Sequence, residues 1–172
     1  MKNIIETDRL ILREITTNDA PFVLALLNTD GWLRYIGDRN VRTIADAEKY
    51  IAERFIKSYF EHGFGLYLVE LKSNNASIGM CGLIKRESLE DVDIGFAFLP
   101  EFTGVGYAYE AAFATLKFAS GVLKLKRILA ITTPDNTSSI KLVEKIGLQF
   151  EKKILFEEKE ELFLFGISDL QF

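Results

Sequence analysis

The chain has 172 residues, and its 48% hydrophobic content, with 14 phenylalanines, is enough to build the core of one domain, residues 1–172. A single cysteine and a single histidine exclude an internal disulfide and argue against a multi-ligand metal site or Ser-His-Asp chemistry. The net charge of −4 argues against nucleic acid as a partner, because a grip on phosphates needs an excess of cations.

No stretch of the sequence approaches the roughly 20 apolar residues that a membrane-spanning helix needs. The first 15 residues also lack the long apolar run of a secretory signal. We therefore expect a cytoplasmic protein with no membrane partner and no bound metal.

The N-terminal region predicts a strand that leads into a helix. Apolar and polar residues alternate over residues 10–15, which indicates a strand. Residues 16–28 then predict a helix with Asn18 or Asp19 as its cap and Pro21 near its first turn.

Residues 30–40 predict a loop or a short helix, and a long helix follows over residues 43–63. Thr43 stands three residues before Asp46, which is the spacing of a capping box, and apolar residues then recur at helical intervals. Gly63 is placed to end this helix.

Three runs rich in aliphatic and aromatic residues come next, at 65–72, 77–86 and 91–100. Residues 73–76, with the sequence SNNA, suit a hairpin connection between the first two runs. The pattern predicts three consecutive antiparallel strands.

The remaining pattern again alternates helical and extended segments. It predicts, in order, a helix at 107–123, a buried strand at 127–133, a helix at 134–147 that Gly147 ends, and a hairpin of strands at 150–156 and 161–169. Strands and helices in this order predict an α/β protein with a mixed sheet and helices packed on it.

Gly104 and Gly106 stand immediately before the helix predicted at 107–123. A helix N-terminus exposes unpaired N–H groups and the positive end of the helix dipole, and glycine lets a phosphate approach without a Cβ in the way. The alternative is that the two glycines only permit a turn or close packing of the helix. Neither the triphosphate-binding pattern nor the dinucleotide-binding pattern is present, because Tyr109 replaces the third glycine of the latter.

The segment DVDIGFAFLPEFTGVGYAYEAAFATLKFA resembles the acyl-CoA-binding motif of the GNAT N-acetyltransferase superfamily, whose signature Q/R-x-x-G-x-G/A falls here on Glu101–Gly106. Glu101 stands at the first position of the signature in place of Gln or Arg, and in this respect the chain resembles the RimJ/RimL-like branch of ribosomal-protein N-terminal acetyltransferases. The resemblance extends to ETDRLILRE near the start and DNTSSIKLVEKIGLQFE near the end. It implies the GNAT fold, a mostly antiparallel mixed sheet of about seven strands with about four helices.

The resemblance also implies acetyl-CoA as cosubstrate and a set of residues that bind it. Backbone groups at the β-strand end, Phe96 and Phe98, would pair with the pantetheine arm, and one of their amides would polarise the acetyl carbonyl. Asn136 and Ser139 match the family's N-x-x-S, although Asn136 can equally be a plain helix cap. The residues whose backbone would bind the pyrophosphate are Thr103, Gly104, Val105, Gly106, Tyr107 and Ala108.

The catalytic groups are less well defined by the resemblance. Val143 occupies the position at which many family members carry a tyrosine as general acid. Ser139 or water is therefore left to protonate the leaving thiolate. Asp93 is the candidate general base, with a solvated acid at a strand end as the alternative. Tyr35 and Tyr67 are candidates to line the acceptor cleft, with simple packing as the alternative.

The resemblance implies an N-acetyltransferase in which an amine attacks the thioester directly in a ternary complex. The expected acceptor is a protein or peptide N-terminal amine, or a small-molecule amine. The alternatives are a non-catalytic acyl-CoA-binding sensor and a nucleotide-binding regulatory domain. The apolar stretch at 161–167 is a candidate surface for a homodimer.

Two further residues are expected to be structural. His62, at the end of a predicted helix, suits a capping role. Cys81 has apolar flanks and is expected to be buried, which disfavours an acyl-cysteine intermediate.

Overall fold

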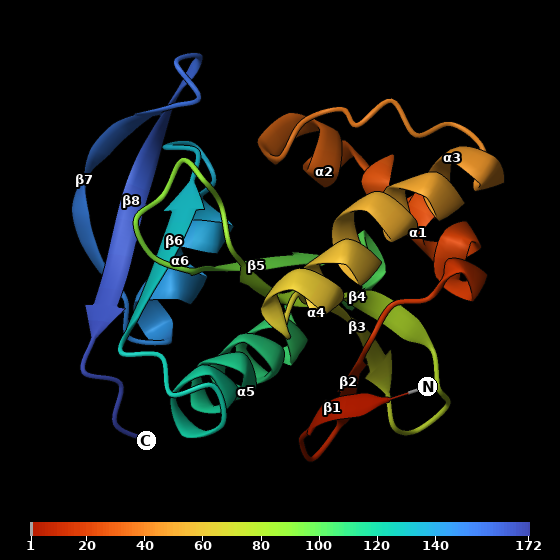
Figure 1. Cartoon of the computed structure of the whole chain (residues 1–172), viewed down its shortest axis with the longest axis horizontal. Coiled ribbons are helices and arrows are strands. Elements are labelled where there is room, and N and C mark those ends of the chain that lie inside the picture. The colour runs from red at the N-terminus through yellow and green to blue at the C-terminus, as the bar shows by residue number, and fades with distance from the viewer. Residues whose placement is uncertain (1) are drawn as a thin grey trace.

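The computed structural model describes residues 2–172, and these residues form one sheet of eight strands (Figure 1). The order across the sheet is β1-β2-β3-β4-β5-β6-β8-β7, and within these residues β5 and β6 are parallel while the other neighbours are antiparallel. The mostly antiparallel mixed sheet is therefore confirmed. The strands are β1 (Asn3–Glu6), β2 (Leu10–Arg13), β3 (Leu66–Leu71), β4 (Ser77–Ile84), β5 (Asp93–Phe98), β6 (Arg127–Thr132), β7 (Gln149–Phe156) and β8 (Glu160–Ser168).

The expected number of about seven strands is one short, because the sequence did not reveal β1. This edge strand has four residues and buries Ile5 alone, so its periodicity is too short to be recognised. It forms by pairing with β2 through a turn at residues 7–9.

The helices follow the predicted order. They are α1 (Ala20–Leu27), α2 (Asp30–Tyr35), α3 (Ile44–Tyr50), α4 (Lys57–His62), α5 (Tyr107–Gly121) and α6 (Thr137–Lys145), with a π-helical segment at Ile51–Ile56 and 3₁₀ turns at Thr17–Asp19 and Pro100–Phe102.

The long helix predicted at 43–63 is confirmed as α3, the π-helical segment and α4 in unbroken succession. The Thr43 side chain accepts a hydrogen bond from the Asp46 amide at 3.1 Å, and the Asp46 carboxylate accepts one from the Thr43 amide at 2.9 Å. Gly63 ends the helix with a φ of 75°, which lies in the left-handed region. His62 is the last residue of α4, and its ring stacks on Phe64 at 5.9 Å.

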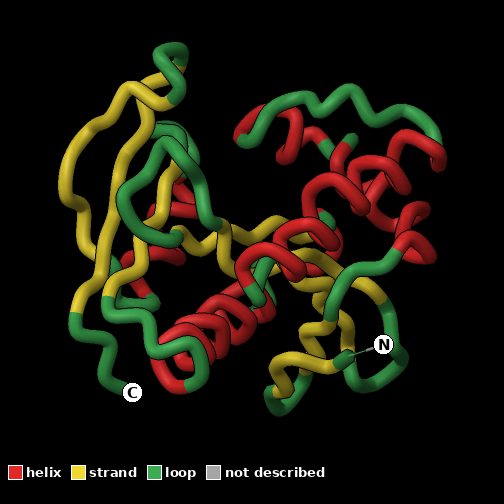
Figure 2. The backbone as a smooth tube through the Cα atoms, in the orientation of Figure 1, coloured by secondary structure: helices red, strands yellow, loops and turns green. Residues whose placement is uncertain are grey.

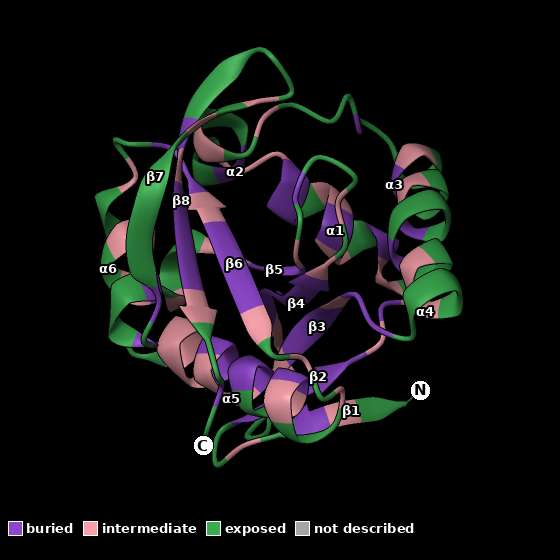
Figure 3. Cartoon of the chain, turned by 60° about the vertical axis from the view of Figure 1, so that its left-hand side comes forward, coloured by how far each residue is buried: buried purple, intermediate pink, exposed green. Residues whose placement is uncertain are grey.

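The helices cover both faces of the central strands β3, β4 and β5, and the tube in Figure 2 shows these layers. On β3, Tyr67 and Val69 belong to the apolar cluster under α5, whereas Leu68 packs with the cluster under α1 and α3. This alternation follows from the opposite directions of successive side chains in a strand. In Figure 3 the buried residues follow these strands and the inner sides of the helices.

The sheet opens between β5 and β6. Asp93, the first residue of β5, lies opposite Leu129 of β6, and the two strands then turn away from each other (Figure 1). This opening gives the sheet a free internal edge along the later residues of β5, immediately before the loop that leads to α5. Within residues 2–172 no helix is both long and apolar enough to cross a membrane.

Candidate functional site

Beyond Asp93, every second residue of β5 turns its backbone N–H and C=O groups toward the opening between β5 and β6. The Leu83 amide donates to the carbonyl of Gly65, the residue just before β3, at 3.1 Å, so Leu83 directs its backbone groups away from its cross-strand neighbour Ile94 on β5. Alternation along the strand then turns the backbone N–H and C=O groups of Phe96 and Phe98 toward the opening. These two residues are the ones that the sequence indicated for strand-like pairing with a ligand.

The loop after β5 presents a series of free amides. Gly104 and Gly106 have φ values of 78° and 88°, and Gly106 is the N-cap of α5. Among residues 2–172, no carbonyl or side chain accepts a hydrogen bond from the amides of residues 104–109, and the first helical bond joins the Glu110 amide to Gly106 at 3.0 Å. This arrangement suits an anion at the positive end of the α5 dipole.

The space next to Gly104 tests whether a phosphate can approach. A Cβ built at Gly104 would meet no atom within 4 Å, so the protein leaves the surface of this loop open. A positive φ also disfavours a larger residue here, because an L side chain rarely adopts it. The residues therefore fit a diphosphate in both conformation and access.

Thr103 differs from the other residues of the loop. Its amide donates to the Pro100 carbonyl at 3.3 Å, and its hydroxyl donates to the same carbonyl at 2.8 Å. Thr103 therefore closes the 3₁₀ turn at Pro100–Phe102, and its amide is not free for a ligand, although the family resemblance implies such a contact.

Asn136 is the N-cap of α6, which begins directly after the loop that follows β6. Its side-chain oxygen accepts a hydrogen bond from the Ser139 amide at 3.2 Å, so the capping alternative for Asn136 is confirmed. The Asn136 backbone amide donates to the Thr133 carbonyl at 3.1 Å, whereas among residues 2–172 the side-chain Nδ2 of Asn136 and the Ser139 hydroxyl make no hydrogen bond. Both groups remain available at the β6 side of the opening.

Asp93 is buried where β5 and β6 still pair, with 1% of its surface exposed. The alternative of a solvated acid at a strand end is therefore wrong. Burial raises the pKa of Asp93 to about 6, and the Arg86 guanidinium, which donates to it at 2.9 Å, opposes that rise. A carboxyl group with this pKa can exchange a proton near neutral pH.

Val143 is 1% exposed and packs in the core of the protein. An apolar side chain at this position has no proton to give a leaving thiolate.

The two tyrosines proposed for the acceptor cleft have different surroundings. Tyr35 is half-buried at the end of α2, where the Arg34 guanidinium lies 4.9 Å from its ring. Arg34 also pairs with Asp135 at 3.2 Å, which brings α2 beside the loop that follows β6. Tyr35 therefore lies near the opening.

Tyr67 does not line a cleft in this structure. It is 1% exposed and packs between Tyr59, stacked at 5.6 Å, and Phe118, edge-on at 6.3 Å. Burial raises the pKa of Tyr67 to about 12. The packing alternative therefore describes Tyr67, because its strand position turns the ring under α5.

Cys81 is fully buried, as the sequence predicted. Burial raises the pKa of its thiol to about 12, and its sulfur lies 3.5 Å from the Thr115 hydroxyl. A protonated, inaccessible thiol is a poor nucleophile.

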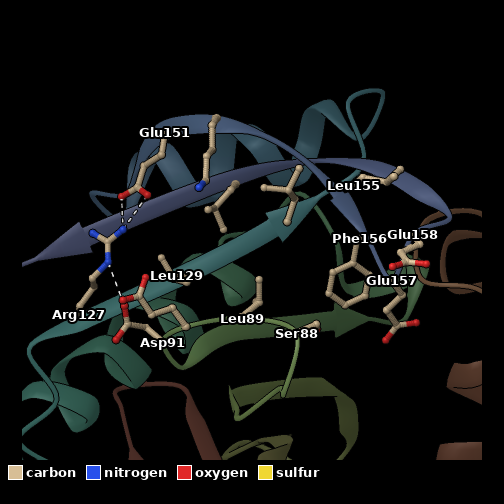
Figure 4. Close-up of a pocket in the computed structure, with 14 residues that line it drawn as sticks. Ser88, Leu89, Asp91, Arg127, Leu129, Glu151, Leu155, Phe156, Glu157 and Glu158 are labelled. Carbon is tan, nitrogen blue, oxygen red and sulfur yellow. Dashed lines mark hydrogen bonds and ion pairs between the residues drawn. The ribbon is translucent and has the colours of Figure 1, made fainter.

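A cavity of about 410 Å³ lies between residues 88–91 and the β6-β8-β7 part of the sheet (Figure 4). Arg127 pairs with Asp91 at 3.2 Å and with Glu151 at 2.7 Å at one end of it. Leu129 lines the cavity and is the parallel neighbour of Asp93, so the Asp93 side chain points to the same face of the sheet. No sequence pattern predicts this cavity, because its walls are far apart in the chain.

Sequence reasoning also missed the arginines that surround the candidate site. Arg86 pairs with Asp93, and Arg9 contacts Val105 and Glu110 beside the glycine loop. Arg9 and Glu110 both lie within the motifs that carry the family resemblance, and this was the available signal. Within residues 2–172, no group of three or more His, Cys, Asp or Glu side chains could hold a metal ion.

Comparison with known proteins identifies the family. Residues 9–149 match the acetyltransferase (GNAT) domain. The chain is 33% identical over 149 residues to the uncharacterized N-acetyltransferase YoaA of Bacillus subtilis (strain 168), which covers 86% of this chain and 84% of YoaA.

Solved structures show the same fold. An acetyltransferase (GNAT family) from Bacillus anthracis has a TM-score of 0.79 and 28% identity, covering 97% of this chain and 99% of that chain. RimL, a ribosomal L7/L12 alpha-N-protein acetyltransferase solved in complex with coenzyme A, has a TM-score of 0.83 and 16% identity, covering 99% of this chain and 100% of that chain. The chain belongs to the GNAT family and is an acetyltransferase.

Proposed function

We propose that this acetyltransferase moves the acetyl group of acetyl-CoA to a primary amine by direct attack in a ternary complex. The observation that carries the proposal is the free internal edge of β5, which leads into a loop with positive-φ glycines and unpaired amides at the N-terminus of α5. The free edge of β5 suits an extended arm that contains amides, and the loop at the N-terminus of α5 suits a diphosphate.

The coenzyme supplies a thioester whose carbonyl carbon accepts the amine. The amides of residues 104–108 hold its diphosphate, and the Phe96 and Phe98 backbone groups hold its pantetheine arm. An amide of this edge donates to the acetyl oxygen and stabilises the negative charge that develops there. Asn136 and Ser139 contact the arm from the β6 side.

The chain also needs a group that removes a proton from the attacking ammonium. We assign this role to Asp93, because its side chain points to the face of the sheet that carries the cavity and its pKa is raised to about 6. The pair with Arg86 must open, or a water must link it to the amine, for this transfer to occur. Ser139 or water protonates the leaving thiolate, since a thiol pKa of about 8.5 makes this a modest demand.

The acceptor we propose is a protein or peptide N-terminal amine, or a small-molecule amine. RimL, which shares the fold, is described as acting on a protein α-amine. An α-ammonium has a pKa of about 8, against about 10.4 for lysine, so it loses its proton more readily to a carboxylate. Tyr35, near the opening, is the proposed acceptor contact.

A second candidate is a non-catalytic acyl-CoA-binding sensor. Two observations favour it: Val143 provides no acid, and Asp93 is tied to Arg86 with 1% of its surface exposed. Such a protein would bind the coenzyme without transferring its acetyl group.

The test is an acceptor screen with purified protein and acetyl-CoA, in which release of free thiol is measured. The panel contains peptides with free N-termini, the same peptides with blocked N-termini and one lysine, polyamines and amino acids. We expect turnover with at least one class, and we expect Asp93→Asn to lower kcat about 100-fold or more while coenzyme binding is retained. Tight coenzyme binding without thiol release across the panel would favour the sensor.

A further inference from the structure

The turn between β1 and β2 is hydrogen-bonded to the first turn of α5, which lies about 100 residues later in the chain. Glu110 accepts hydrogen bonds from the Thr7 hydroxyl at 2.6 Å, from the Arg9 amide at 2.9 Å and from the Arg9 Nε at 2.6 Å. Burial alone would raise the pKa of Glu110, but these donors lower it below its ordinary value. Glu110 therefore remains ionised and can hold Arg9 in one orientation.

Arg9 connects this acid to the glycine loop. Its Nη1 donates to the Val105 carbonyl at 3.1 Å, and its guanidinium lies 4.5 Å from the centre of the Tyr107 ring. The segment 99–112 contains no lysine or arginine, so the cation beside this loop comes from another part of the chain. Arg9 is also 47% exposed and is not needed to fill the core.

The Val105 carbonyl determines where the next amide points. In a trans peptide the C=O of one residue and the N–H of the next point in opposite directions. Because Arg9 holds the Val105 carbonyl on its own side, the Gly106 N–H is directed away from Arg9, to the other side of the loop. A Cβ built on Gly106 would lie 3.3 Å from Arg9 Nη2, so glycine also makes room for this contact.

We infer that Arg9 is a positioning residue for coenzyme binding, and that with Glu110 it holds the Val105–Gly106 peptide with its N–H turned toward the diphosphate. The inference rests on the proposed function, because it assumes that this loop binds the diphosphate of the coenzyme. We call the Arg9–Glu110–Val105 contacts the latch.

The first measurement is the dissociation constant for CoA, which does not require activity. For Arg9→Gln and for Glu110→Gln we expect it to rise about tenfold, the scale of one lost charge-assisted hydrogen bond at a partly exposed site. Arg9→Lys should also bind CoA more weakly than the wild type, since one ammonium cannot reach both Glu110 and the Val105 carbonyl with the geometry of a guanidinium.

Lys72→Gln is the matched control. Lys72 pairs with Glu6 at 3.4 Å next to the same β1-β2 hairpin, and its removal takes away one cation without touching the latch. This variant should bind CoA as tightly as the wild type. Thermal unfolding without ligand establishes that each variant is folded before its affinity is compared.

The second measurement separates positioning from a general structural role. S-acetylpantetheine carries the reacting thioester but no diphosphate, so the latch should not affect its use. We expect Arg9→Gln to raise the KM for acetyl-CoA about tenfold, with kcat and the KM for the amine unchanged, while kcat/KM for S-acetylpantetheine stays within about twofold of the wild-type value.

The outcomes distinguish the two proposals. If the wild type binds CoA but Arg9→Gln and Glu110→Gln bind it equally well, the latch is refuted and the proposed function stands. If both thioesters lose the same factor, Arg9 has only a structural role and the inference is again wrong. If the wild type binds no CoA, the proposed function falls and takes the latch with it.

Discussion

Asp93 illustrates how much one buried charge can influence this protein. Its carboxyl group is almost fully removed from water, and its ion pair with Arg86 is open to solvent on the arginine side, where 28% of the side chain is exposed. The pair therefore does not fully compensate the loss of hydration, and the pKa of Asp93 rises from 3.8 to about 6.

This raised pKa makes a prediction for stability against pH. Between about pH 4 and pH 6 the folded chain keeps a proton on Asp93 that the unfolded chain has released, so the stabilisation is present at low pH and lost as the pH rises through about 6. Relative to Asp93→Asn, the wild type should lose up to about 3 kcal/mol of unfolding free energy across this range. Urea unfolding of both proteins at several pH values measures it.

The slope of the difference between the two proteins is the decisive quantity, because Asn adds a constant offset of its own. If the two stability curves run parallel between pH 4 and pH 7, Asp93 has an ordinary pKa and burial does not raise it.

The position of a residue within its helix or strand could be predicted where a short motif defines it. The burial of that residue and its contacts in the fold could not. The sequence located Asp93 and Asn136 correctly within their elements, but the burial of Asp93 and its contact with Arg86 depend on strands β4 and β6. Tyr67 was misassigned to the acceptor cleft because the face of β3 that lies under α5 is decided by tertiary packing.

The loop before α5 combines an unusual backbone with the proposed binding surface for the coenzyme. Gly104 has a φ of 78° and open space where a Cβ would be. Gly63, at the end of α4, has a φ of 75° and equally open space, but lies outside the candidate site. The two glycines therefore form a matched pair for mutation.

Gly104→Val and Gly63→Val should each lose about 1–2 kcal/mol of stability, because valine is strained at positive φ. Gly104→Val alone should weaken CoA binding, by about tenfold or more, since the side chain covers the amides that the diphosphate would contact. Calorimetric titration with CoA provides the affinities. Equal affinities of the two variants would contradict the placement of the diphosphate at this loop.

The helices and most strands could be predicted because their signals are local. The capping-box spacing of Thr43 and Asp46 and the glycine at position 63 defined the longest helical segment from sequence alone, and the structure has both features. β1 was missed because pairing with β2, and not its own four residues, stabilises it.

The opening between β5 and β6 is the feature of the fold that brings the parts of the candidate site together. It places the free edge of β5, the start of α5 and the N-cap of α6 around one space, although Asn136 lies 38 residues after Phe98, the last residue of β5. Sequence reasoning reached this arrangement through the resemblance to a family. Periodicity alone could not have predicted it, since the divergence of two parallel strands leaves no local pattern.

The most direct test of this account is hydrogen exchange of the wild-type protein, read by mass spectrometry, with and without CoA. Within residues 2–172 the amides of residues 104–109 have no hydrogen-bond acceptor, so they should exchange fast without ligand. We predict that CoA slows exchange at the amides of the loop that bind the diphosphate. We predict the same at the amides of Phe96 and Phe98, which bind the pantetheine arm. Protection confined to the cavity lined by residues 88–91 and 151–158, with residues 96–109 unchanged, would contradict the proposed site.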